Sequence, residues 1–164
     1  MSSPTSPDPK KEESDVWHRR FAVEANNLGW DLAELPSRTA DEARQLVHAA
    51  HTAAYHWAIV GKPLNNARAK MLLAKAHLLS GDAALAAGYA REVIDFCETS
   101  AEIARWDLAF AHALMAQAAA AVGDPAGLAR HAEAARACRG TLQHAEETAL
   151  FEAELAKIPG VWNG

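Results

Sequence analysis

The chain has 164 residues, half of them apolar, which is the length of one domain and enough for a single core without disulfide staples. Alanine occurs 39 times while β-branched and aromatic residues are sparse, so the composition favours packed helices over strands. A formal net charge of −5 without a basic stripe excludes a nucleic-acid partner, and no apolar run reaches the ~20 residues of a membrane span, so we expect a cytoplasmic protein.

The N-terminal segment differs in character from the rest of the chain. Residues 1–13 contain three prolines, serines and mixed charges, and have no apolar face, so we expect a disordered tail. From Ser14 onward apolar residues recur at spacings of three and four, which predicts a first helix that ends before Pro36. We therefore expect one helical domain over residues 14–158 and a short C-terminal tail over 159–164. The apolar face of the first helix consists of Trp17, Phe21, Ala25, Leu28, Leu32 and Leu35.

Helix-start signals divide the next part of the chain into three helices. Thr39 and Glu42 have the spacing of a capping box and predict the start of a second helix, which should end at Val60 before a glycine and a proline. A third helix is expected over about 64–80. An aspartate after the following glycine predicts a fourth helix that extends to about Cys97.

Helix-start signals also divide the C-terminal part of the chain into three helices. Thr99 and Glu102 form a second possible capping box, which predicts a long fifth helix closing at Gly123. Asp124 as N-cap and Pro125 as first helical residue predict a sixth helix that ends near residue 140. A seventh helix is expected over about 143–157. The two cysteines, Cys97 and Cys138, lack a CxxC spacing and are expected to be free thiols buried in helices.

The predicted helices contain an internal repeat. The segments around Gly81 and Gly123 resemble each other, and the two turns are 42 residues apart, longer than the usual tetratricopeptide period of about 34. Small residues flank both turns where two helices of a hairpin would cross closely. We therefore expect an all-α fold of about seven helices in stacked antiparallel hairpins, a right-handed tetratricopeptide-like array. The small residues are Ala74 and Ala116 before the turns, and Ala86 and Ala129 after them.

Histidines concentrate in the segment from Val47 to Arg68. His48, His51 and Tyr55 lie on one face of the second predicted helix, and weak metal binding through the two histidines is one interpretation. General acid–base chemistry, a non-catalytic small-molecule pocket, and structural histidines at helix contacts are the others. No HExxH motif, carboxylate–histidine pair of the di-iron kind or Cys-His cluster occurs. The catalytic residues therefore stay unknown, and no cofactor is predicted.

Two polar residues at the start of the third predicted helix also have alternative roles. Asn65 is well placed to cap that helix. Arg68 can pair with Glu34 or Asp41, or it can hold a ligand carboxylate or phosphate bidentately. In the second case three tryptophans would wall the same hollow, although each also fits helix packing: Trp30, Trp57 and Trp106.

The histidine-rich segment and the helical segments around it resemble a group of short bacterial tetratricopeptide-like proteins, a group without an assigned activity. The resemblance covers about residues 17–158, and it implies the repeat fold and a bacterial origin. The chain departs from the group after His112, where Ala113 replaces an acidic residue that relatives often carry. The most specific part of the resemblance is the run formed by His56, Trp57, Val60, Gly61, Asn65 and Arg68.

Three functions follow as expectations. The first is an interaction module that binds a protein or peptide partner, or another copy of itself, through its concave face. The second is a small-molecule-binding protein or enzyme that uses a pocket between the second, third and fifth helices. The third, weaker one is metal binding by histidines. Because polar residues shared with the resembling group more often line a pocket, the candidate ligand contacts are His51, His56, Trp57, Asn65, Arg68, Trp106, Asp107 and His112.

Overall fold

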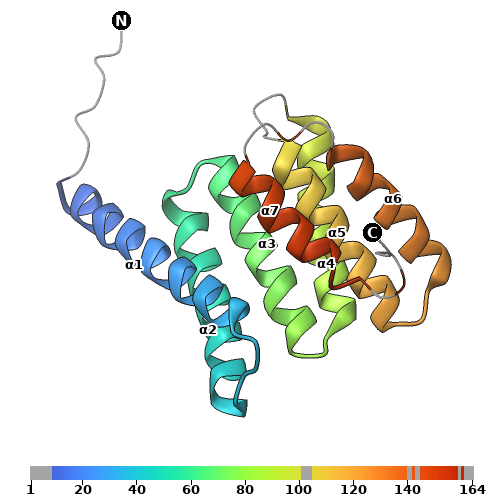
Figure 1. Ribbon diagram of the computed structural model, residues 1–164. Helices are drawn as coiled ribbons and strands as arrows, with labels where there is room; N and C mark the ends of the chain where they lie inside the picture. Colours follow the sequence, from blue (N-terminus) through green and yellow to red (C-terminus); the bar gives the residue numbers. More distant parts are fainter. Residues whose placement is uncertain (1–8, 101–104, 140–141, 143–144, 159, 161–164) are drawn as a thin grey trace, which may run out of the picture.

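The structure is a computed structural model that describes residues 9–100, 105–139, 142, 145–158 and 160. Within these residues it contains seven α-helices and no strand, which confirms the expected all-α fold (Figure 1). None of the described helices is long and apolar enough to cross a lipid bilayer. The helices are α1 (Pro9–Glu34), α2 (Ala40–Val60), α3 (Pro63–Leu79), α4 (Ala83–Thr99), α5 (Arg105–Ala121), α6 (Pro125–Arg139) and α7 (Ala145–Leu155).

The helices are arranged as hairpins that stack in chain order. The helices within each of the pairs α1–α2, α3–α4 and α5–α6 pack against each other, and α2–α3 and α4–α5 contacts join one hairpin to the next. Helices α1, α3 and α5 also touch in succession, and we call them the first layer. Helix α7 packs against α5 and α6 and lies across the first layer (Figure 1).

The core is continuous through the stack and is built largely from alanine. One buried cluster joins α1, α2 and α3, a second joins α3, α4 and α5, and a third joins α5, α6 and α7. Ala74 and Ala116 are 0% exposed, and Ala86 is 1% exposed, as expected where helices cross closely. Ala129 is exposed, so that prediction was wrong. The buried alanines of α6 are Ala132 and Ala135 instead, because their side chains lie on the face toward α5.

Three of the predicted helix starts are present with their hydrogen bonds. At α2 the amide of Glu42 donates to Thr39 Oγ1 over 3.2 Å, and the amide of Thr39 donates to Glu42 Oε2 over 2.7 Å. This hydrogen bonding from Thr39 lowers the pKa of Glu42. Asp82 accepts from the Leu85 amide at α4. Asp124 accepts in the same way from the amide of Gly127 at α6.

Two boundary predictions were wrong. Helix α1 begins at Pro9, so residues 9–13 belong to a helix, because proline suits the first helical position and lysine and glutamate are good helix formers. Residues 1–8 lie outside the described part. Thr99 does not cap α5, because it is still the last residue of α4 and its hydroxyl donates to the Asp95 carbonyl. Residues 101–104, with Glu102 of that capping box, lie outside the described part, as do 161–164.

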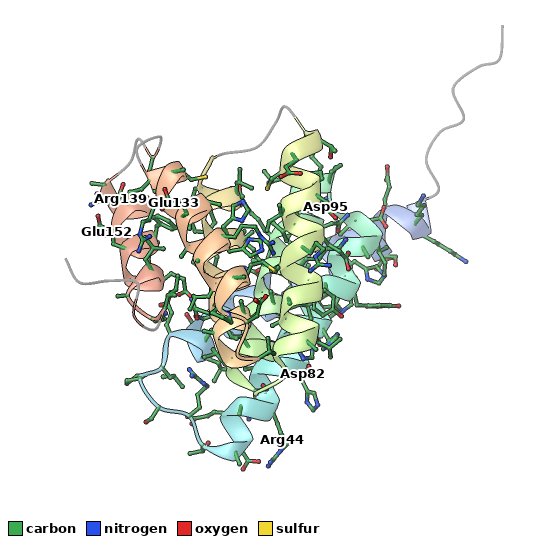
Figure 2. All side chains as sticks on the ribbon, turned by 90° about the vertical axis from the view of Figure 1, so that its right-hand side faces the viewer. Arg44, Asp82, Asp95, Glu133, Arg139 and Glu152 are labelled. Atoms are coloured by element: carbon green, nitrogen blue, oxygen red, sulfur yellow. The ribbon has the colours of Figure 1, made fainter. Side chains whose placement is uncertain are left out.

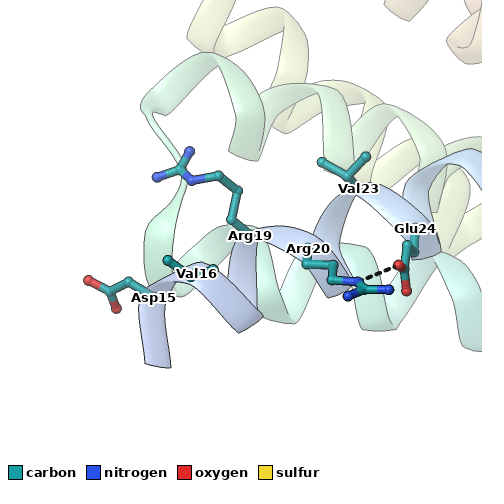
Figure 3. Close-up of a pocket in the computed structure, with 6 residues that line it drawn as sticks. All are labelled: Asp15, Val16, Arg19, Arg20, Val23 and Glu24. Carbon is teal, nitrogen blue, oxygen red and sulfur yellow. Dashed lines mark hydrogen bonds and ion pairs between the residues drawn. The ribbon is translucent and has the colours of Figure 1, made fainter. Parts of the chain in front are cut away.

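The predicted apolar face of α1 is only partly covered. Figure 2 shows the side chains filling the space between helices, and the C-terminal half of α1 contributes Leu32 and Ala33 to this core. Trp17, Phe21 and Leu28 are 43–48% exposed. The reason is that α1 is the first helix of the stack and has a neighbouring hairpin on one side only. Figure 3 shows an open pocket on the surface of the same segment, where Arg20, one of its lining residues, pairs with Glu24.

Replacing Ala74 with leucine is expected to lower the free energy of unfolding by about 1–3 kcal/mol, because the larger side chain overpacks a close helix contact. The matched control is Ala129→Leu, which adds the same atoms at an exposed helical position and is expected to change stability by less than about 0.5 kcal/mol. Urea titrations followed by circular dichroism measure both values. Equal losses in the two variants would contradict the close contact at Ala74.

Candidate functional site

Arg68 of α3 holds a carboxylate of the protein itself. Its Nε lies 2.9 Å from Oδ1 of Asp107 on α5, and its Nη2 lies 3.2 Å from Oδ2, so the ion pair is bidentate. The Asp107 side chain is 1% exposed, whereas that of Arg68 is 49% exposed. The predicted pairing with Glu34 or Asp41 was therefore wrong. Glu34 and Asp41 lie at or near the ends of α1 and α2, whereas the guanidinium of Arg68 is bound to a carboxylate of α5, the neighbour of α3 in the first layer.

Asn65 caps α3, as one of its two interpretations predicted. Its Oδ1 accepts a hydrogen bond of 2.9 Å from the amide of Lys62, the residue before the first helical position. Trp57 packs at the junction of α1, α2 and α3. The adjoining Gly61 allows the tight turn between α2 and α3, because a Cβ there would lie 2.5 Å from the carbonyl oxygen of Trp57. These residues shape the connection between two hairpins.

The other predicted site residues include histidines that pair with histidines of neighbouring helices. His51 Nε2 lies 3.1 Å from His77 Nε2, between α2 and α3. Within the described residues, two further pairs of histidines also bring ring nitrogens of neighbouring helices within hydrogen-bonding distance. They are His56 Nδ1 with His18 Nδ1 at 2.7 Å, between α2 and α1, and His112 Nδ1 with His131 Nδ1 at 3.1 Å, between α5 and α6.

The environment of these pairs lowers the pKa of four of their histidines. Burial lowers the pKa of His77, and the neighbouring His51 lowers it further. Burial likewise lowers the pKa of His56, His112 and His131. A neutral ring can donate with one nitrogen and accept with the other, so each pair can form one hydrogen bond across two helices. His48 is exposed, and among the described residues no three potential ligands come together for a metal ion.

The structure thus distributes the predicted site residues over several helix junctions. The hollow that one of the alternatives formed from Arg68 and three tryptophans is not present in that composition. Trp30 and Trp106 do share a pocket, while Trp57 packs elsewhere and Arg68 is paired with Asp107. Whether the residues predicted as ligand contacts bind a ligand stays a prediction.

The pocket that contains the two tryptophans has a volume of about 380 Å³ and lies between α1, α3, α5 and α7. We call it the first-layer pocket. Three of its lining residues are aromatic and in mutual contact: Phe110 meets Trp30 edge to face with ring centroids 5.8 Å apart, and it stacks on Trp106 at 5.1 Å. Leu150 of α7, which is 52% exposed, forms part of the rim. The remaining lining residues are Ala33, Glu34, Lys75, Ala153, Glu154 and Lys157.

One end of the first-layer pocket contains a buried charge cluster. Lys75 Nζ of α3 lies 2.5 Å from Glu154 Oε1 of α7, and both side chains are less than 5% exposed. Gln117 donates to the same oxygen over 2.8 Å, and Lys157 donates to Oε2 over 2.7 Å. Burial lowers the pKa of Lys75. Burial opposes ionisation of Glu154, but attraction to Lys75 and the donated hydrogen bonds lower its pKa overall, so we assign it as a carboxylate.

Sequence reasoning missed this cluster because its members are far apart in the chain. Lys75 and Glu154 are separated by 79 residues, and no local spacing connects them. One signal was available: Lys75 stands in the apolar stretch MLLAKAHLL, where a charged residue needs a partner. The identity of that partner depends on where α7 packs.

Comparison of the chain with models of known protein families, with curated proteins and with solved structures finds no match. The resemblance to tetratricopeptide-like proteins therefore stays a prediction. Function has to be argued from the geometry of the first-layer pocket and its surroundings.

Proposed function

We propose that the protein is a tetratricopeptide-like interaction module that binds a protein or peptide partner through the first-layer pocket. The observation that carries the proposal is the combination of three aromatic rings, from Trp30, Trp106 and Phe110, around a cavity of about 380 Å³. Cavities of about 300 Å³ and more are typical of ligand sites. An apolar side chain of the partner inserted among these rings would act as the anchor that dominates the binding energy of many interfaces.

The polar end of the pocket supports binding more than catalysis. A lysine that acts as a nucleophile must present a free amine, whereas Nζ of Lys75 is held by the carboxylate of Glu154. Lys157 is different, because its side chain is 49% exposed while it contacts the same carboxylate. It can donate a further hydrogen bond to a main-chain carbonyl next to the anchor. The cluster thus orients the partner, and the aromatic walls provide the affinity.

The experiment is a random-peptide display selection on the purified protein, followed by calorimetric titration of the most enriched peptide. We expect enriched sequences with a recurrent aromatic or long aliphatic residue and a dissociation constant in the micromolar range, typical of one anchor. The test variant is Leu150→Glu, which places a charge on the rim of the pocket. The matched control is Leu85→Glu on α4, because Leu85 is 47% exposed and does not line the pocket.

We expect Leu150→Glu to weaken peptide binding at least tenfold and Leu85→Glu to leave it unchanged. Both positions are half exposed, so neither change is expected to unfold the protein, and thermal melting checks this. Equal affinity in the two variants would place the peptide elsewhere and overturn the proposal. Selection of no peptide, together with binding of small aromatic fragments that depends on Leu150, would assign the pocket to a small molecule instead.

A further inference from the structure

A second groove lies on the opposite side of α5 from α7. Helices α4 and α6 both pack on α5, but in the described part of the chain their backbones do not pack closely against each other. Figure 2 shows α4 and α6 side by side on the face turned toward the viewer. The space between them contains a cavity of about 290 Å³ with α5 as its floor. We call it the α4–α6 groove.

The floor and sides of the α4–α6 groove are apolar and built from small residues. Because most of these side chains are methyl groups, a flat apolar group can approach the helix backbones closely. The lining from the three helices consists of Ala83, Ala84, Ala87, Met115, Ala118, Ala119, Val122 and Gly127.

The rim of the groove is basic. Arg91 of α4 faces Arg130 and His131 of α6, and Arg130 Nη2 lies 3.5 Å from His131 Nε2. Neither arginine forms an ion pair with an acidic side chain in the described part of the chain. Asp124 also lines the groove, but its Oδ1 accepts from the Gly127 amide as the cap of α6. Two arginines against one aspartate leave a local charge of +1 on a chain whose net charge is −5.

We propose that the α4–α6 groove binds a small organic anion, with its phosphate or carboxylate group between Arg91, Arg130 and His131 and its apolar body on the alanine floor. Guanidinium groups match phosphate and carboxylate oxygens bidentately, and no carboxylate of the described chain takes this place. The cavity volume is close to the lower limit for ligand sites, which fits a single ring with one anionic group. The groove is separate from the first-layer pocket.

His131 makes this binding sensitive to pH. Burial lowers its pKa, as do the neighbouring His112, Arg130 and Arg91, while Asp124 acts in the opposite direction. A bound anion adds negative charge beside the ring, so it favours the protonated form and raises the pKa of His131. By linkage, the anion binds more tightly as the pH falls through the range in which His131 becomes protonated.

The test uses phenyl phosphate, phenylacetate and inorganic phosphate as probes at low salt. Proton NMR of the imidazole C2–H resonances follows binding, and His131→Gln assigns the His131 signal. We expect phenyl phosphate or phenylacetate to shift this signal saturably and to raise its pKa, and inorganic phosphate to bind less tightly because it lacks the apolar body. Whichever ring-bearing probe saturates at the lower concentration identifies the anionic group.

Arg91→Gln and Arg130→Gln are each expected to weaken binding about tenfold, since each removes a charge-assisted hydrogen bond. The control is Arg136→Gln on the same helix, because Arg136 pairs with Glu133 and does not line the groove. Thermal melting verifies that all three variants are folded. Non-saturating shifts, or equal weakening by Arg136→Gln, would overturn the proposal. Binding that persists in Leu150→Glu would show that the groove acts independently of the first-layer pocket.

Discussion

Replacing Glu154 with glutamine should lower the free energy of unfolding by about 3–5 kcal/mol, the cost of leaving a buried charge without its counterion. Lys75 is less than 5% exposed and has Glu154 as its ion-pair partner in the described structure. Urea titration at pH 7 measures the loss. The control is Glu152→Gln on the same helix, because Glu152 forms an ion pair with Arg139 at the surface and contributes at most about 1 kcal/mol.

The pH dependence of Glu154→Gln provides a second readout. Without the carboxylate, burial lowers the pKa of Lys75 further, so between this folded value and the unfolded value of about 10.4 the folded state binds fewer protons than the unfolded state. Stability in this range rises with pH and is lost as the pH falls. The variant should therefore regain stability between pH 7 and pH 9 relative to the wild type. An equal deficit at both values would show that Lys75 is not the source of the loss.

Arg68→Met should have the second-largest effect, a loss of about 3 kcal/mol, because it leaves the carboxylate of Asp107 buried without its guanidinium. Methionine preserves much of the apolar stem, so the change tests the charge more than the packing. Arg68→Lys should recover only part of the loss, since an ammonium cannot form both hydrogen bonds of the bidentate pair. Chemical denaturation at neutral pH measures both variants.

A matched control for Arg68→Met lies two residues further along α3. Lys70 is 40% exposed and pairs with Glu92, whose side chain is 52% exposed, so Lys70→Met is expected to cost less than about 1 kcal/mol. The two basic residues are similarly exposed, and the difference lies in the burial of their acidic partners. Equal costs for Arg68→Met and Lys70→Met would contradict the assignment of Asp107 as a buried, dependent charge.

The helices and most of their ends were predictable because the signals are local. The capping residues Thr39, Asp82 and Asp124 act within one helical turn, and the glycines at 81 and 123 adopt φ of +84° and +70°, where other residues are strained. The prediction that Thr99 caps the fifth helix was wrong for a physical reason. A threonine can cap the next helix or bond back to its own, and the sequence does not show which bond forms.

The candidate site was less predictable because it depends on pairs of residues that are distant in the chain. The sequence pointed to His51, Arg68 and Asp107 as candidate ligand contacts, but it did not indicate that the arginine and the aspartate bind each other. Likewise, each histidine pair joins two helices whose relative register is set by the whole hairpin packing. A hollow shared by Trp30 and Trp106 was one of two alternatives for these residues, beside ordinary helix packing, whereas Phe110 and the residues of α7 that complete the pocket had no signal of their own.

The placement of α7 has a consequence for the order of events during synthesis. The hairpins of α1 to α6 can pack as the ribosome releases them, but Leu150, Ala153, Glu154 and Lys157 reach the first-layer pocket only after residue 157 has emerged. Until then Lys75 lacks its ion-pair partner Glu154, and the pocket beside the aromatic rings lacks the side formed by α7. For the function proposed above, this means that a nascent chain would complete its binding pocket only after α7 has been synthesised, and that a chain truncated before α7 would not bind a partner there.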